Sequence, residues 1–109
     1  MATRLSAKLP FRWPEREIEA FCQRWKIVQL DLFGSVLRED FRPDSDIDLL
    51  VEFSSGAEWS LLDHARMERE LEEILGRSVD LVTRWAVEES PNWIRRDAIL
   101  STARQVYGR

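Results

Sequence analysis

Two aspartates separated by one residue, Asp46 and Asp48, are the side chains in this sequence best placed to do chemistry. The residues that follow each of them, Ile47 and Leu49, are apolar, and this alternation is typical of a half-buried strand. Both carboxylates then leave the same face, with Cα atoms about 6.6 Å apart. Two like charges at that spacing repel unless a cation lies between them, and carboxylate oxygens suit Mg²⁺, which takes its other ligands from water and phosphates. We therefore predict that Asp46 and Asp48 bind Mg²⁺.

A phosphate-binding turn is predicted just before this pair, at Gly34 and Ser35, with a spacer of ten residues in between. A glycine lets the backbone approach a phosphate closely, and the amide and hydroxyl of the next residue can donate to phosphate oxygens. Ser45 is a further donor directly before the aspartates. Arg38 could place a guanidinium on the same triphosphate, although it is equally consistent with a solvated charge beside Glu39 and Asp40.

A third carboxylate, Asp80, is predicted on a short strand at 79–82, with its side chain opposite to Val79 and Leu81. It would face the same metal if this strand pairs beside the strand of Asp46 and Asp48. In that position it could be another metal ligand or the base that takes a proton from an acceptor. His64, the one histidine, falls on the apolar side of a helix and is expected to pack rather than to catalyse.

The elements that position these residues follow from the change between helical and strand periodicity. We predict helices at 14–25, 60–75 and from Ser90 and Pro91 to about Ala103, and strands from Ile27 to Gly34, at 46–53 and at 79–82. Residues 35–44 are predicted to be a turn, with one helical turn around 36–39. Ser60 and Asp63 form a predicted capping box for the second helix, and Gly76 ends it. This order predicts one α+β domain over residues 14–109, with a small mixed β-sheet flanked by helices, preceded by an arm over residues 1–13.

Composition narrows the class of protein. The chain has 109 residues and a net charge of -4, so a long nucleic acid is not expected to be its main partner. No apolar run is long enough for a membrane span, and no secretory signal is evident, so we expect an intracellular, cytoplasmic protein without a membrane partner. Cys22, the single cysteine, is expected to be buried, whereas Asp31 and the acidic run 68–73 are expected to be solvated. The five tryptophans are either partly buried packing residues or a contact surface for another protein.

The segment GSVLREDFRPDSDIDLLVEF, residues 34–53, resembles the signature of the DNA polymerase β-type nucleotidyltransferase superfamily. The short chain, the segment VDLVT at 79–83 and a C-terminal helix ending in Val106, Tyr107 and Gly108 are similar to the minimal nucleotidyltransferases called MNT. The resemblance covers residues 14–108. It departs from the family at Glu39, where many relatives have glycine, which puts the shape of that turn in doubt.

The resemblance implies a polymerase β-like nucleotidyltransferase core in which Asp46, Asp48 and Asp80 bind Mg²⁺ and catalyse transfer, while Gly34 and Ser35 bind phosphate. Family members are commonly antitoxins paired with an all-helical HEPN-domain toxin, an RNase. Some of them inactivate the toxin by transferring AMP from ATP to one of its tyrosines. The chain is thus expected to be a Mg²⁺-dependent nucleotidyltransferase that acts on a cognate HEPN toxin.

One alternative is an antitoxin that neutralises its toxin mainly by binding, with little catalysis. In that case the tryptophans would be interface anchors. A nucleotidyltransferase of the antibiotic-modifying type is disfavoured, because such enzymes carry an additional domain for their acceptor. A homodimer of the free chain remains an option that the sequence does not decide.

Overall fold

A four-stranded mixed sheet lies at the centre of the molecule in the computed structural model, which describes residues 12–34 and 46–108. Its strands are β1 (Ile27–Phe33), β2 (Ile47–Phe53), β3 (Val79–Thr83) and β4 (Arg104–Gly108), in the spatial order β3-β2-β1-β4. Strand β1 is antiparallel to both β2 and β4, whereas β2 and β3 are parallel. The predicted α+β class with a small mixed sheet is confirmed.

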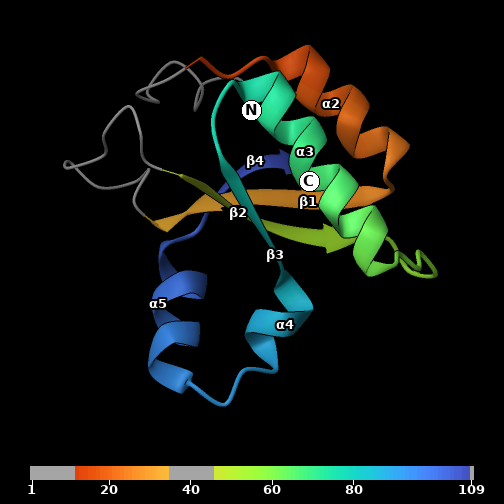
Figure 1. Ribbon diagram of the computed structural model, residues 1–109. Coiled ribbons are helices and arrows are strands. Elements are labelled where there is room, and N and C mark those ends of the chain that lie inside the picture. Colours follow the sequence, from red (N-terminus) through yellow and green to blue (C-terminus); the bar gives the residue numbers. More distant parts are fainter. Residues whose placement is uncertain (1–11, 35–45, 109) are drawn as a thin grey trace.

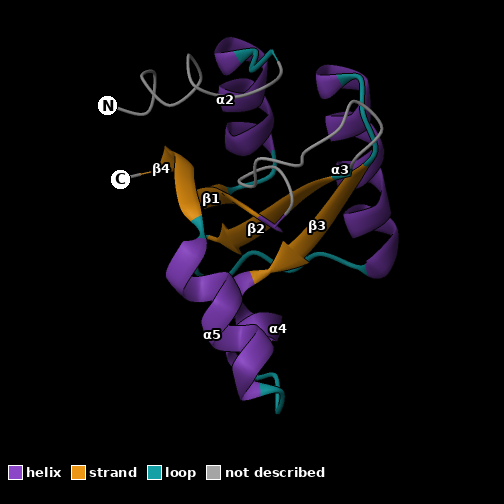
Figure 2. Cartoon of the chain, turned by 90° about the vertical axis from the view of Figure 1, so that its left-hand side faces the viewer, coloured by secondary structure: helices purple, strands orange, loops and turns teal. Residues whose placement is uncertain are grey.

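Helices cover both faces of this sheet. The helices α2 (Glu15–Arg24) and α3 (Leu61–Leu75) lie together on one side, which we call the helical face (Figure 1). The helices α4 (Arg84–Glu88) and α5 (Trp93–Thr102) lie on the other side (Figure 2). We call this side the carboxylate face because the strand register directs Asp48 and Asp80 toward it.

The helical face holds the larger hydrophobic core. Alternate residues of the strands enter it and pack against α2 and α3. Its most deeply buried side chains are Ile18, Phe21, Cys22, Leu30, Leu32, Ile47, Leu49, Val51, Met67 and Leu71. Burying one such side chain contributes about 1.5–3 kcal/mol, so this face supplies most of the hydrophobic stabilisation. It also fixes the register of β2, because a one-residue slip would turn Asp46 and Asp48 into the core.

The ends of α3 follow the sequence closely. The Ser60 hydroxyl accepts a hydrogen bond from the Asp63 amide at 3.1 Å, and the Asp63 carboxylate accepts one from the Ser60 amide at 3.0 Å. These bonds lower the pKa of Asp63, with the backbone bond as the main cause. Gly76 closes the helix in the left-handed conformation, with φ of 70°. The predicted capping box and stop are confirmed.

Two elements at the C-terminal end of the chain were not predicted. Residues 84–88 form α4, whose first turn is capped by the Thr83 hydroxyl, and residues 104–108 form β4. The expectation of a C-terminal helix ending in Val106, Tyr107 and Gly108 was therefore wrong, since α5 ends at Thr102. Val106 is buried in the core, and pairing of β4 with β1 covers an edge that would otherwise expose backbone groups.

At the margins of the domain, the structure shows where packing begins and where the last helix starts. Trp13, assigned to the N-terminal arm, is 8% exposed and belongs to the core, so the packed part of the chain begins no later than that residue. The last helix begins after an Asn92 cap rather than at Ser90 and Pro91. The predicted turn at 35–44 lies outside the described residues, and so does most of the arm. No helix in the part that is described is long and apolar enough to cross a bilayer.

Candidate active site

Gly34 and Asp48 meet where β1 ends and β2 begins. Phe33 is the register partner of Asp48 in the antiparallel pair, so Gly34 follows directly beside the aspartate. Gly34 has φ of +79°, which side chains rarely tolerate, and a Cβ at this position would lie 3.1 Å from Cγ of Asp48 and closer still to Oδ2. The position therefore requires glycine for two independent reasons, its backbone angle and its contact with a carboxylate.

The predicted third carboxylate lies beside the first two. Strand β3 pairs with β2, and Asp80 is the register partner of Asp48. Partners on neighbouring strands are about 4.8 Å apart and project from the same face, so both carboxylates belong to the carboxylate face. Asp46 comes just before β2, on the same side as Asp48, and is exposed. We expected Asp80 to lie near the other two aspartates if its strand pairs with theirs, and β3 does pair with β2.

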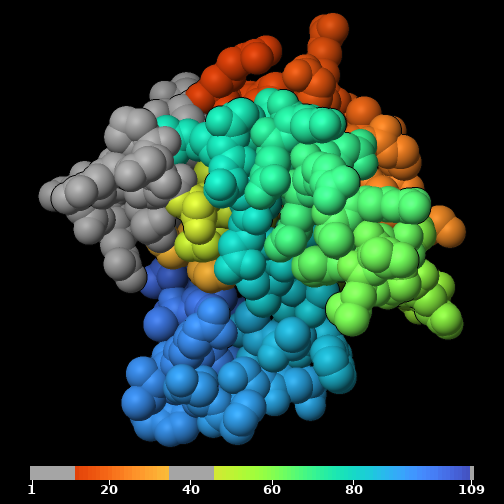
Figure 3. All heavy atoms as spheres, in the orientation of Figure 1, coloured from red at the N-terminus to blue at the C-terminus, as the bar shows by residue number. Residues whose placement is uncertain are grey.

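These carboxylates lie at an accessible surface. Asp46 and Asp80 are exposed and Asp48 is half-buried. Figure 3 shows the start of β2, in yellow, at the surface beside the blue-green of the β3 region. Two acidic residues opposite one another in a sheet repel, and a cation between them would relieve that repulsion.

The donor set fits a magnesium ion that also binds a phosphate. In residues 12–34 and 46–108, no three His, Cys, Asp or Glu side chains lie close enough together to hold one metal ion. The aspartates therefore do not form a closed protein cage. Mg²⁺ usually binds to one or two carboxylates and takes its remaining ligands from water and substrate phosphates, so two neighbouring carboxylates beside a glycine turn suit a metal-nucleotide complex. Asp48, with Asp46 or Asp80, would hold the ion.

Three predicted phosphate ligands, Ser35, Arg38 and Ser45, lie outside the described residues. They remain predictions. The doubt about the turn at Glu39 falls in the same segment.

Asp31, expected to be exposed, is instead buried on the carboxylate face with 4% exposure. Its Oδ2 accepts a hydrogen bond from the Arg84 guanidinium at 2.7 Å, and Gln29 donates to its Oδ1 at 3.0 Å. Arg84 also lies 3.5 Å from Glu52. The expectation failed because α4, which was not predicted, covers this face and brings the arginine. The signal available in the sequence was Leu50, an apolar residue that alternation places on the same face.

Helix α3 supports the strand that carries Asp80. The amides of Val79 and Leu81 donate to Glu72 and Glu68 at 3.1 and 2.8 Å, and His64 Nε2 lies 2.6 Å from the Leu81 carbonyl oxygen. These contacts satisfy the outer edge of β3 on both sides of Asp80. The acidic run 68–73 is thus not simply solvated as expected, because two of its members hold a strand edge. His64, expected to be a packed or rim residue, is half-buried and contacts the β3 backbone.

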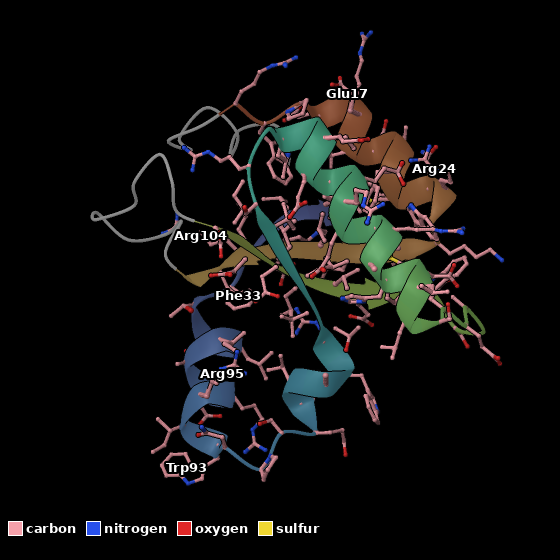
Figure 4. The ribbon with its side chains drawn as sticks, viewed as in Figure 1. Glu17, Arg24, Phe33, Trp93, Arg95 and Arg104 are labelled. Carbon is pink, nitrogen blue, oxygen red and sulfur yellow. The ribbon has the colours of Figure 1, made fainter. Side chains whose placement is uncertain are left out.

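A pocket of about 700 Å³ adjoins Gly34. Phe33 at the end of β1 and the following Gly34 line one part of it, and Arg95 and Arg104 are its charged lining residues. The rest of the lining comes from the C-terminal half of α5 and its cap, Ala98, Ile99, Ser101, Thr102 and Ala103. Figure 4 labels Phe33, Arg95 and Arg104, which lie on one side of the molecule with Phe33 between the two arginines in this view. The size is typical of a small-molecule site. Sequence analysis did not point to either arginine.

Comparisons with known proteins identify the family and the fold. The model of the nucleotidyltransferase domain family matches residues 15–104. The chain belongs to this family. A solved structure of a candidate minimal nucleotidyltransferase is 36% identical, covers 94% of this chain and 92% of its own, and superposes with a TM-score of 0.63. The chain is therefore a minimal nucleotidyltransferase in fold and in family, as the sequence indicated.

Other relatives of this nucleotidyltransferase are described more specifically. A candidate protein adenylyltransferase of Methanocaldococcus jannaschii is 42% identical over 63% of this chain and 72% of the relative. The protein adenylyltransferase MntA of Thermococcus cleftensis is 40% identical over 55% of this chain, a segment that spans 59% of MntA. A crystal structure of a toxin-antitoxin with AMP-PNP shares the fold, with a TM-score of 0.67 and 20% identity, over 89% of this chain and 75% of that one.

Proposed function

We propose that this nucleotidyltransferase transfers AMP from ATP to a hydroxyl group, the tyrosine of a cognate HEPN-domain toxin, and thereby acts as its antitoxin in the cytoplasm. The observation that carries the proposal is the pairing of Asp48 with Asp80 on adjacent strands, with Gly34 packed against Asp48. Carboxylates beside a backbone turn that can approach phosphate are what a metal-nucleotide complex needs. The specific acceptor is suggested by relatives: two are described as protein adenylyltransferases, and one solved complex contains a tri-AMPylated HEPN toxin with an MNT antitoxin.

The reaction can be assigned to this chain's residues. Asp46 and Asp48 would hold the Mg²⁺ ion, which when bound offsets negative charge on the phosphate oxygens. Gly34 leaves room for the phosphates, with Ser35, Ser45 and Arg38 as further proposed donors. Asp80 would accept the proton of the acceptor hydroxyl, as a base or through a water. The acceptor oxygen bonds to the α-phosphorus, the bond from that phosphorus to the bridging oxygen breaks, and pyrophosphate leaves.

The test is an intact-mass measurement on the presumed toxin, the short helical protein expected to be encoded beside this chain. The toxin is incubated with this chain, ATP and Mg²⁺, and in parallel with the Asp46→Asn, Asp48→Asn double variant. We expect a gain of one or more AMP masses with the wild type alone. A toxin of unchanged mass after incubation with a folded wild-type chain would reject AMP transfer.

A second candidate, neutralisation by binding alone, is favoured by one observation. Trp85, Trp93 and Ile94 on α4 and α5 are 72%, 61% and 65% exposed, and exposed tryptophans are typical of protein interfaces. If binding dominates, the Asp46→Asn, Asp48→Asn variant still protects against the toxin. If catalysis dominates, protection is lost with that variant.

A further inference from the structure

The strand that carries Asp80 is held weakly by the sheet itself. Strand β3 has five residues, lies at one edge of the sheet and pairs only with β2, in parallel. Parallel pairing is slightly less stable per residue than antiparallel pairing. Asp80 also lies opposite Asp48, and the repulsion between the two carboxylates opposes the pairing at that point. The place of Asp80 therefore depends on contacts that β3 makes along its outer edge.

Helix α3 supplies contacts along this edge, and it lies beside β3 in Figure 2. The two amides that flank Asp80 along the chain both donate to glutamates of α3. The Val79 amide donates to Glu72 at 3.1 Å, and the Leu81 amide donates to Glu68 at 2.8 Å. Hydrogen bonds to a carboxylate are stronger than those between neutral groups. Asp80 itself stays exposed on the carboxylate face, between two backbone positions that α3 holds.

The spacing of these bonds fixes how far β3 lies along the helix. The two glutamates are four residues apart, which is about 6 Å along a helix, and the two amides are two residues apart, which is about 6.6 Å along a strand. Both bonds therefore form together. The helix is anchored in turn, because Met67 and Leu71, each next to one of the glutamates, are fully buried in the core. If β3 shifted by one residue, both amides would turn away from α3 and Asp80 would point into the core.

The other glutamates of the same acidic run have different surroundings. Glu70 accepts a hydrogen bond from Trp25 Nε1 at 2.9 Å and forms an ion pair with Arg24, so it joins α3 to α2. Glu73 is exposed. The contact with β3 is thus specific to two members of the run, and Glu73 provides a matched control on the same helix.

We propose that Glu68 and Glu72 are positioning residues for the transfer reaction, which keep Asp80 opposite Asp48 by holding the outer edge of β3. The proposal rests on the proposed function. Asp48 lies on β2, inside the sheet, and Asp46 directly precedes that strand, so both keep their places when the two glutamates are changed. Binding of the metal-nucleotide complex is then retained. The step that slows is removal of the proton from the acceptor hydroxyl, so kcat falls while KM for ATP changes little.

The test measures AMP transfer to the toxin of the proposed function by Glu68→Ala, Glu72→Ala and their combination. We expect kcat to fall about fivefold for each single variant and about thirtyfold for the double variant, with KM for ATP within about twofold of wild type. Replacing both residues by Gln keeps an acceptor oxygen at each place and should leave kcat within about threefold of wild type. Glu73→Ala, the control, should stay within about twofold.

The same substitutions in an Asp80→Asn background separate positioning from general stabilisation. If the glutamates act through Asp80, the double alanine change lowers the residual rate in that background by less than about twofold. An equal loss in both backgrounds would reject the proposal, because it would show a general structural role. Wild-type kcat in a double alanine variant that circular dichroism and melting temperature show to be folded would reject it as well. If the double variant does not fold, the single alanine variants carry the same comparison.

Hydrogen exchange of the Val79 and Leu81 amides gives a measurement that does not depend on activity. Both should exchange at least about tenfold faster in the double alanine variant than in wild type or in Glu73→Ala, because they lose their acceptors. Unchanged exchange in a folded double variant would overturn the proposal even if AMP transfer is observed. Absence of AMP transfer by the wild type would instead overturn the proposed function, while exchange would still decide whether the two glutamates hold β3.

Discussion

The two faces of the sheet use the same strands for different purposes. On the helical face, every strand residue between Ile47 and Val51 that points inward is apolar and fully buried under α2 and α3. On the carboxylate face, the alternate residues include Asp48, Asp80 and Asp31 among apolar neighbours such as Leu50. The aspartates on this face have two different environments. Asp31 is buried with Arg84, whereas Asp48 and Asp80 are placed opposite each other, which a sheet selected for stability alone would avoid.

The difference indicates a division of labour. The helical face supplies the folding free energy and fixes which way each strand residue points. The carboxylate face keeps an unfavourable arrangement that the other face can sustain, as functional sites commonly do. Substitutions on the two faces should therefore have separable effects on stability and on catalysis.

The largest expected effect is a contrast between two neighbouring residues that point to opposite faces, Asp48 and Leu49. Asp48→Asn should reduce the proposed AMP transfer at least about a thousandfold, since a proposed metal ligand is lost. The free energy of unfolding should change by no more than about 0.5 kcal/mol, or rise as repulsion from Asp80 is relieved. Leu49→Ala should lower that free energy by about 2–5 kcal/mol and leave the activity of the folded fraction close to wild type. Transfer rates and denaturant unfolding of both variants are the measurements. If folded Leu49→Ala lost as much activity as Asp48→Asn, the two faces would not have separate roles in stability and catalysis.

Gly34→Ala should lower both stability and the proposed AMP transfer, because Gly34 has a left-handed backbone angle and lies against the Asp48 carboxylate. The left-handed backbone angle and the collision with Asp48 together should cost about 1–3 kcal/mol of stability and at least about tenfold in transfer. Gly56→Ala is the matched control: its φ is +89°, but a Cβ there would meet nothing within 4 Å. The comparison of the two variants isolates the contact from the backbone strain. A Gly34→Ala protein no more affected than Gly56→Ala would show that the contact is unimportant.

Asp31→Asn tests the buried charge on the carboxylate face. Removing it leaves Arg84 with only the exposed Glu52, so the free energy of unfolding should fall by about 1–3 kcal/mol. Glu52→Gln, at the exposed end of the same network, should cost about 0–1 kcal/mol. Thermal and denaturant unfolding measure both. Similar values for the two variants would mean that burial of Asp31 contributes little.

The last expected effect, which is absent at neutral pH, concerns Cys22 on the helical face. Burial, with a smaller contribution from Glu19, raises the pKa of this thiol from 9.0 to about 12. The folded state therefore keeps a proton that the unfolded state loses above pH 9, so this residue makes stability fall as pH rises from about 9 to 12. The native protein should resist alkylation at pH 9 and react rapidly in denaturant. Rapid labelling of the native protein would show that the helical face opens there.

Sequence reasoning succeeded where period and spacing carry the information. The strands at Ile27 and at Ile47 and the caps of α3 follow from alternation and from short local motifs. The position of Asp80 beside Asp48 was left conditional on strand pairing, and the pairing of β3 with β2 meets that condition. It failed for α4 and β4, five residues each, since such short elements form mainly because a neighbour offers a surface or an open edge. Those two elements supply Arg84 and Arg104, so the partner of Asp31 and one wall of the Gly34 pocket were missed with them.

The parallel pairing of β2 with β3 means that the carboxylates come from segments joined by a long crossover through α3. Asp46 and Asp48 precede α3 in the chain and Asp80 follows it, so the carboxylates come together only when β3 pairs with β2. A chain in which β3 has not paired with β2 lacks Asp80 at the candidate site, and this pairing requires the closure of a long loop. Activity would then require a fully folded chain. A substitution in α3 that weakens its contacts with β3 would first reduce activity, although α3 lies away from the reacting atoms.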